Sequence, residues 1–441
     1  MKWLFAILIF GAIILFHEFG HFIIAKMNGV AVEEFSMGFG PRLISAEHGG
    51  TRYSLKLLPF GGSCQMKGML EGGMDEDGNF SSSDRPDEDS FQAKSVGRRI
   101  AIVAAGPVFN FILAFTAAVV MISVMGYDPS DVTYVQPDST AEAAGLLAGD
   151  RVERINGRKV VIGRDVDAYF LYHPLTETDT LTLLIDRDGE KREIAFPVNV
   201  TERYLMGIRY YADDNPAVLT EVGETTPAYA AGIRTGDTVV AVNGTAVSSG
   251  AAFQEYFTGH EMDGSSVTLR LSRDGTEWEV SVVPTIQKSV SEGFLCYAAR
   301  EKVSAPRTLR YSLTEIRFWI ETVLQSLKMM FTGRIGVDEL SGPVGVVNIV
   351  SETYEESKEE GALVVSMNML YLLILLSANV GVMNLLPIPA LDGGRLLFLI
   401  IEGLTGRKVN RKVEAGITFA GVLLLILLMV FVMYHDIARL F

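Results

Sequence analysis

Two of the six histidines lie four residues apart in the motif His17-Glu18-Phe19-Gly20-His21, inside an otherwise apolar stretch. On a helix such residues share one face and lie about 6 Å apart along the axis, so both imidazoles can bind one zinc ion. In zinc sites of this spacing, the intervening glutamate acts as a general base. Ionisable side chains in an apolar helix cost free energy, and histidines that only hydrogen-bond to neighbouring helices would leave the carboxylate unexplained. We therefore expect His17 and His21 to bind Zn²⁺ and Glu18 to be catalytic.

The composition indicates a membrane protein with additional soluble parts. The chain has 441 residues, of which 49% are hydrophobic, and its mean hydropathy is +0.26. The apolar residues come in long blocks, which excludes a purely soluble, a disordered and a fibrous protein. The net charge of 38 − 53 = −15 argues against nucleic-acid binding, which needs clustered Lys and Arg. The two cysteines, Cys64 and Cys296, are too few for a disulfide framework.

Four apolar blocks are long enough to cross a bilayer as helices. They cover residues 3–25, 100–125, 362–386 and 417–433. The first could alternatively be a signal peptide, because Lys2 precedes an apolar run. Against this, no small-residue cleavage signal closes the run, and ionisable residues interrupt it.

The positive charges near the ends of these blocks predict the orientation. Lys and Arg are abundant between the first and second blocks and between the third and fourth, so both connections should face the cytoplasm. Residues 126–360 and both termini then lie outside. The acidic run 71–89 is expected to be a solvated, flexible loop. Cys64 and Cys296 fall on opposite sides, so we do not expect them to pair.

The same topology points to a third zinc ligand. A catalytic zinc site needs a third protein ligand and one open position. The cytoplasmic end of the third block, at the depth of the histidine motif, contains Pro387, Pro389 and Asp392, and the prolines free backbone to line a cavity. We predict that Asp392 is this ligand. The alternative is that Asp392 only caps a helix that begins at Gly393.

The outer segment contains an internal duplication. Ala144-Gly145, Gly149-Asp150 and Asn156-Gly157 recur 87 residues later, and Arg187-Asp188-Gly189 recurs 86 residues later. Alternating apolar residues around each Asp-Gly predict β-hairpins. The pattern resembles the PDZ domain in its bacterial, protease-associated form, which binds extended peptide ends at a sheet edge.

Two further features of the outer segment allow more than one interpretation. Met206, Gly207 and Ile208 could form the carboxylate-binding loop of the second copy, or an ordinary turn that enters a strand. Residues 306–330 carry a helical apolar stripe with cations elsewhere. That helix could lie on the membrane surface or pack on the spanning helices.

Two motifs together resemble the site-2 protease family of intramembrane zinc metalloproteases. They are the His-Glu-Phe-Gly-His motif in the first block and Asn-(x)2-Pro-(x)4-Asp-Gly-Gly, from Asn384 to Gly394, at the third. Gly106-Pro107-Val108-Phe109-Asn110 and Leu340-Ser341-Gly342-Pro343 are also similar to family signatures, and the resemblance covers essentially the whole chain.

The resemblance implies roles for matching residues. His17, His21 and Asp392 would hold zinc, Glu18 would activate water, and Asn384 would contact the unwound substrate backbone. Pro59-Phe60-Gly61-Gly62 resembles a membrane-entering β-hairpin that offers substrate an edge, through Gly61 and Gly62, although paired glycines alone more often mark a plain turn. The usual aromatic-Val-Lys continuation of this hairpin is replaced here by residues 63–67, Ser-Cys-Gln-Met-Lys.

We therefore predict a polytopic α-helical membrane protein with about four transmembrane helices, a membrane-associated β-hairpin and two inserted PDZ-like α/β domains. The expected parts are an N-terminal membrane part (1–126), a first PDZ-like domain (127–203) and a second PDZ-like domain (204–286). A connector with an amphipathic helix (287–361) and a C-terminal membrane part (362–441) follow.

The predicted function is zinc-dependent hydrolysis of peptide bonds within or near transmembrane segments of single-span membrane proteins. The family resemblance implies anti-sigma factors or remnant signal peptides as substrates, and the bacterial cytoplasmic membrane as the location. The PDZ-like pair would filter substrates or bind newly exposed carboxyl ends. Two alternatives are a non-catalytic membrane adaptor and a metal-binding transporter. An intact Glu18 with a third ligand argues against the adaptor, and the lack of an evident conduction path argues against the transporter.

Overall fold

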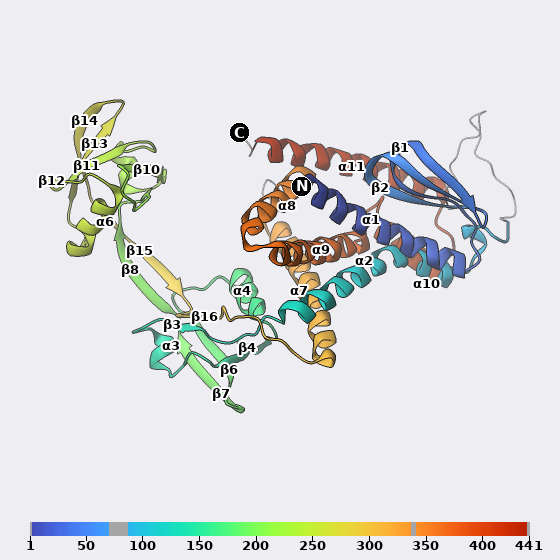
Figure 1. Ribbon diagram of the computed structural model, residues 1–441, viewed down its shortest axis with the longest axis horizontal. Helices are drawn as coiled ribbons and strands as arrows, with labels where there is room; N and C mark the ends of the chain where they lie inside the picture. The colour runs from blue at the N-terminus through green and yellow to red at the C-terminus, as the bar shows by residue number, and fades with distance from the viewer. Residues whose placement is uncertain (1, 70–86, 337–340, 439–441) are drawn as a thin grey trace. The chain divides into compact units, whose positions relative to one another are not determined.

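The computed structural model describes residues 2–69, 87–336 and 341–438. Most of the acidic run 71–89, and Leu340 of one signature, therefore lie outside the described residues. The chain forms two compact units. The first unit combines Met1–Pro129 with Ala299–Phe441, and the second is Ser130–Ala298 (Figure 1).

Four helices of the first unit are long and apolar enough to cross a membrane, as the sequence predicts. They are α1 (Lys2–Met27), α2 (Val96–Met125), α9 (Ala362–Leu385) and α11 (Arg411–Ala438). Ile13 of α1, Leu113 of α2 and Leu372 of α9 belong to one buried core. This packing favours α1 as an integral helix over a removable signal peptide. Further helices of the unit are the long α7 (Ala305–Phe331) and the shorter η1 (Phe91–Ala93), α8 (Pro343–Ser357), η3 (Lys358–Glu360) and α10 (Asp392–Thr405).

A glycine brings the histidine motif against α2. A Cβ atom added to Gly20 would lie 2.4 Å from the carbonyl oxygen of Ala105, so a larger residue would push α1 and α2 apart. The side chains at positions 17, 18 and 21 therefore lie in the space that α1 shares with its neighbours.

The strands β1 (Val32–His48) and β2 (Thr51–Met66) form a bent antiparallel hairpin. Glu34 lies opposite both Arg52 and Gln65 because the first half of β1 contacts two parts of β2. Within the described residues, the segment 62–66 pairs with β1 on one side only, so its other edge is unpaired. Leucines and isoleucines near the middle of the hairpin are exposed in this chain, among them Leu43, Ile44, Leu57 and Leu58.

Helix α7 packs on the spanning helices, which answers one question that the sequence leaves open. Ile316, Trp319 and Val323 are buried, and the Trp319 ring lies edge-on to Tyr371 of α9, with centroids 5.6 Å apart. Leu309 and Leu313 of the predicted stripe are exposed. The stripe is thus divided between a packed face and an open face.

The second unit contains eighteen short elements and two buried cores. The first core belongs to the sheet β5-β4-β6-β7 and the second to the sheet β9-β10-β11-β13-β14, with β12 on β11. The first group of elements is β3 (Tyr134–Val135), α3 (Thr140–Ala143), β4 (Arg151–Ile155), β5 (Arg158–Lys159), α4 (Gly163–Tyr172), β6 (Thr180–Arg187) and β7 (Glu190–Pro197). The others are β8 (Asn199–Leu205), β9 (Ile208–Tyr210), β10 (Ala217–Val222), α5 (Pro227–Ala230), β11 (Thr238–Val242), β12 (Thr245–Ala246), α6 (Gly250–Gly259), β13 (Val267–Arg273), β14 (Thr276–Val282), β15 (Thr285–Ser291) and β16 (Phe294–Leu295).

The two cores repeat the same polar contacts. Arg187 donates two hydrogen bonds to the buried Asp150, at 2.5 and 2.7 Å, and Arg273 donates two to the buried Asp237, at 2.6 and 2.8 Å. Each arginine also bonds a glycine carbonyl, Gly145 or Gly232. The Gly-Asp and Arg-Asp-Gly landmarks of the sequence are therefore one ion pair used twice.

The first core is completed by residues that follow the second one. Phe294 and Cys296 are buried in the first core, and β16 pairs with β3 as β9 pairs with β10. Strands β8 and β15, on either side of the second module in sequence, pair along their lengths (Figure 1). The segment 287–361, which we assigned to the connector, thus contributes to the first module. A hairpin pattern in the sequence could not show this, because the pairing joins residues about 160 positions apart.

Candidate metal centre

The structure brings His17, His21 and Asp392 together. Asp392 Oδ2 lies 3.2 Å from His17 Nε2 and 3.2 Å from His21 Nε2, and the two Nε2 atoms are 3.3 Å apart. Both histidines come from α1, and Asp392 is the first residue of α10. These are the three described residues that could hold a metal ion together.

The geometry of these three atoms fits zinc. Ligands at about 2.0–2.1 Å on a tetrahedron are separated by about 3.3 Å, which matches the sides of this triangle. Asp392 Oδ2 is buried and accepts no well-directed hydrogen bond in the described structure, although both imidazoles are within contact distance. Two imidazole nitrogens and a carboxylate oxygen are a donor set that zinc prefers, and a tetrahedral ion would keep a fourth position open.

Asp392 does not act as a helix cap. The residue that precedes α10 is Leu391, and no side-chain hydrogen bond caps this helix. The two glycines that follow let the helix start fold back on the preceding loop. A Cβ atom at Gly393 would lie 2.0 Å from Leu386 O, and one at Gly394 would lie 2.5 Å from Ile388 O. The Asp-Gly-Gly motif is therefore what allows the carboxylate to reach α1.

Glu18 lies beside the hairpin. A Cβ atom at Gly62 would lie 3.0 Å from Glu18 Cγ, so the Glu18 side chain lies against this segment of β2. The base expected from the motif is thus next to the unpaired edge of segment 62–66.

Two other predicted contact residues have clear structural settings. Gly61 has a φ of +88°, and a Cβ atom there would lie 1.8 Å from the Phe39 ring, so only glycine fits. Asn384 is half-buried in the last turn of α9, and its side chain forms no hydrogen bond with the residues that the structure describes. Among the described residues, no hydrogen bond joins Asn384 to His17, His21 or Asp392.

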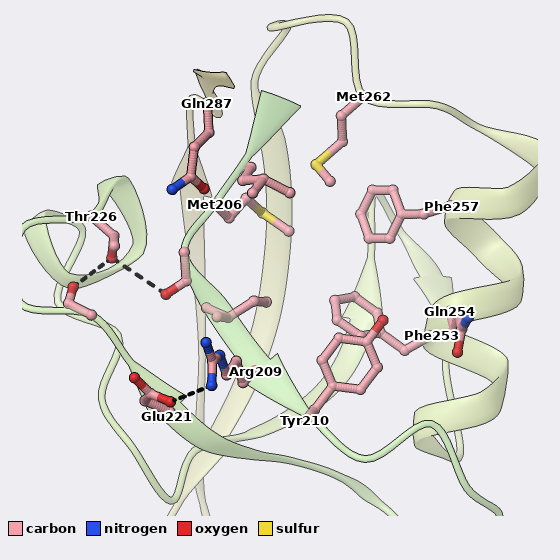
Figure 2. Close-up of a pocket in the computed structure, with 14 residues that line it drawn as sticks. Met206, Arg209, Tyr210, Glu221, Thr226, Phe253, Gln254, Phe257, Met262 and Gln287 are labelled. Carbon is pink, nitrogen blue, oxygen red and sulfur yellow. Dashed lines mark hydrogen bonds and ion pairs between the residues drawn. The ribbon is translucent and has the colours of Figure 1, made fainter. Parts of the chain in front are cut away.

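Met206, Gly207 and Ile208 line a cavity of about 530 Å³ in the second module (Figure 2). Phe253 and Phe257 of α6 form its apolar wall together with Met262, and the Tyr210 ring of β9 packs against Phe253, with centroids 4.9 Å apart (Figure 2). Gly207 has a φ of +82°, and a Cβ atom there would lie 2.2 Å from Thr226. The three residues border an apolar groove between a strand and a helix, and their role as a carboxylate-binding loop stays a prediction.

Several residues around these sites are not among those that the sequence predicts. The carbonyl of Ile102 accepts a hydrogen bond from His21 Nδ1, at 2.9 Å, and Asn110 contacts His17. Gly293, with a φ of +78°, occupies in the first module the place of Gly207 in the second, because Gln136 N bonds its carbonyl as Gly223 N bonds that of Gly207. A signal for Asn110 was present in the Gly106–Asn110 motif, whereas no signal pointed to Gly293.

The chain is similar to known proteins along almost its full length. Residues 5–428 match the sequence model of the family described as Peptidase family M50. The chain is 30% identical to "Zinc metalloprotease RasP" of Geobacillus kaustophilus, over 99% of this chain and 97% of the relative. It is 31% identical to "Regulator of sigma-E protease RseP" of Salmonella typhimurium, over 98% of each chain. One solved structure, an HtrA3 PDZ domain bound to a phage-derived ligand, is 21% identical and covers 20% of this chain and 92% of that chain, with a TM-score of 0.17.

The candidate metal centre combines two histidines of α1, a helix long and apolar enough to cross a membrane, with an aspartate at the start of the shorter α10. The chain belongs to Peptidase family M50, the site-2 protease family, and is a zinc metalloprotease. The relatives support a role in regulated intramembrane proteolysis.

Proposed function

We propose that this protease cleaves single-span membrane proteins within or near their transmembrane segments, with His17, His21 and Asp392 as zinc ligands and Glu18 as the base. The observation that carries the proposal is the triangle of Nε2, Nε2 and Oδ2 atoms, 3.2–3.3 Å on each side, formed by α1 and α10. It lies beside an open strand edge, so a metal site and a peptide-binding edge are adjacent.

The chemistry divides between the metal and Glu18. Bound zinc supplies a Lewis acid that polarises the scissile carbonyl and acidifies the attacking water. Glu18 takes a proton from that water and returns a proton to the leaving nitrogen. The close approach of Gly62 to the Glu18 side chain keeps this carboxylate beside the edge where the peptide would lie.

Substrate helices must unwind before cleavage, because their peptide bonds are hydrogen-bonded internally. The unpaired edge of segment 62–66 offers backbone partners for an extended substrate, and each such bond contributes about 1 kcal/mol net. The free amide of Asn384 supplies a further partner. The exposed leucines and isoleucines of the hairpin suit contact with lipid, which supports a hairpin that lies in the membrane.

The outer unit would act as a substrate filter, on the side of the membrane opposite to the chemistry. The cavity beside Met206, Gly207 and Ile208 suits an apolar carboxyl-terminal residue of an extended peptide, because its wall is aromatic and its rim presents backbone groups. Anti-sigma factors and remnant signal peptides are substrates of suitable topology. We place the protein in the bacterial cytoplasmic membrane, with the metal centre near the cytoplasmic face.

The test is a comparison of Glu18→Gln with the wild type in purified, full-length protein. We expect both proteins to contain one zinc per chain, and only the wild type to cleave a single-span substrate in liposomes. An adaptor would show no dependence on Glu18, and a transporter would move ions without cleaving. Cleavage by Glu18→Gln at the wild-type rate would overturn the proposal.

A further inference from the structure

The stretch Gly106-Pro107-Val108-Phe109-Asn110 of α2 lies against the two histidines. A Cβ atom at Gly106 would lie 2.3 Å from His21 Nε2 and 2.8 Å from His17 Cε1, so this glycine leaves space for both rings. One turn earlier, Ile102 O accepts the bond from His21, and one turn later, Asn110 lies at His17. Positions 102, 106 and 110 share one face of α2, with the same four-residue spacing that separates the two histidines.

The bond from His21 to Ile102 fixes one tautomer. A carbonyl oxygen only accepts, so the His21 ring carries its hydrogen on Nδ1. The lone pair on Nε2 then faces Asp392 and is available to a metal ion. His21 is therefore prepared for zinc by the backbone of α2.

His17 is held differently, by a buried amide that is only half paired. Asn110 is fully buried, and its Nδ2 lies 3.2 Å from His17 Nδ1. Its Oδ1 is buried and has no hydrogen-bond partner among the described residues. Because an amide nitrogen only donates, this orientation requires Nδ1 of His17 to accept and places the ring hydrogen on Nε2. That tautomer cannot bind a metal through Nε2.

Rotating the amide by 180° exchanges its donor and its acceptor while it keeps its shape. Oδ1 then accepts from Nδ1–H, and Nε2 of His17 presents a lone pair beside that of His21. We propose that Asn110 is a positioning residue and that, with its amide in this second orientation, it holds His17 in the metal-binding tautomer. An amide suits this position because it can pair with either tautomer. The proposal rests on the zinc site of the proposed function.

Three substitutions test whether zinc binding depends on the hydrogen-bond acceptor of the Asn110 side chain or only on its size. Asn110→Asp keeps the size and offers only acceptors, Asn110→Leu keeps a similar size and offers none, and Asn110→Ala avoids overpacking if the leucine variant fails to fold. We expect full-length Asn110→Leu and Asn110→Ala to bind zinc about 10–100-fold more weakly than the wild type, measured by competition with a chromophoric chelator. Asn110→Asp should remain within about threefold of the wild type, because its carboxylate accepts from Nδ1–H.

Ser377→Ala is the matched control. Ser377 Oγ donates a hydrogen bond to the backbone carbonyl of Asn110 at 2.8 Å. The change therefore removes a buried contact to Asn110 and leaves its side-chain amide in place. We expect its zinc affinity to equal that of the wild type. Wild-type affinity in Asn110→Ala, or equal losses in the aspartate and alanine variants, would overturn the inference. If the wild type itself bound no zinc, the proposed function would fail, which is a different result.

Discussion

Arg99 and Glu402, 303 residues apart in sequence, form a bidentate ion pair with N–O distances of 2.6 and 3.1 Å. The side chains are only 5% and 13% exposed. Arg99 lies near the start of α2, and Glu402 lies in the last turn of α10. The pair therefore ties the helix that begins with Asp392 to the helix that packs against the two histidines.

Breaking this pair should destabilise the membrane unit. Glu402→Gln leaves the Arg99 charge buried without its counter-ion, and we expect a loss of about 3–5 kcal/mol of unfolding free energy. Thermal and denaturant unfolding of the detergent-solubilised protein measure this loss. Glu47→Gln removes a charge from an exposed pair with Arg52 in the same unit, where a change below about 1 kcal/mol is expected. Equal stabilities of the two variants would contradict the prediction.

Gly62→Ala should impair catalysis while the metal stays bound. The new Cβ atom would lie 3.0 Å from Glu18 Cγ and 3.1 Å from Ser36 O, so the base or the strand must shift. We expect kcat to fall about tenfold, with unchanged zinc content, because small displacements of a catalytic group slow the reaction. Gly97→Ala, at an exposed position in the first turn of α2 with nothing within 4 Å of the added atom, is the control. The prediction is wrong if both variants cleave equally fast.

The second module should lose stability in acid through Asp237. Burial alone would raise the pKa of this carboxyl, but the hydrogen bonds from Arg273 and from the Arg234 backbone outweigh burial, so its pKa is lowered from 3.8. A carboxyl with a lowered pKa in the folded state contributes stability that is present above pH 3.8 and is lost as the pH falls further.

Trp278 reports on this pair, because the Arg273 guanidinium lies 5.0 Å from its ring centroid. In a chain with the other tryptophans replaced by Phe, Trp278 fluorescence should follow unfolding of the second module. We expect Asp237→Asn to lower the stability of the second module at neutral pH. It should also flatten the acid limb, which is the loss of this stability as the pH falls below 3.8. Asp150→Asn breaks the equivalent pair of the first module and should leave the Trp278 acid limb unchanged. A wild-type acid limb in Asp237→Asn would refute the assignment.

Removal of the whole outer unit should loosen substrate choice without abolishing zinc-dependent cleavage. The compact unit is Ser130–Ala298, so a deletion that stops at Pro284 would strand Phe294 and Cys296 of the first core. The ends can be rejoined, because Tyr127 and Glu301 exchange two backbone hydrogen bonds of 2.9 Å. Cleavage of substrates with and without a folded outer domain measures the effect. A deletion variant that retained zinc but cut no membrane substrate would exclude the filter.

The sequence by itself predicted the four apolar helices and all three converging residues, His17, His21 and Asp392. The helices and the histidine pair are encoded locally: a helix of apolar residues has one stable setting in a bilayer, and the four-residue spacing places His17 and His21 on one face regardless of the rest of the chain. The repeat was also visible in the sequence, because each copy needs its own buried Asp and an Arg that pairs with it. These are Asp150 with Arg187 and Asp237 with Arg273.

The tertiary structure decided what depends on contacts between distant segments. Asp392 reaches the histidines only because Gly393 and Gly394 let a helix fold back on its loop and Glu402 ties that helix to Arg99. Phe294 completes a core that begins more than 150 residues earlier, and the role of Asn110 depends on which ring atom it faces. Side-chain periodicity carries no information about such partners, since the pattern within a segment records only which face is buried and not what covers it.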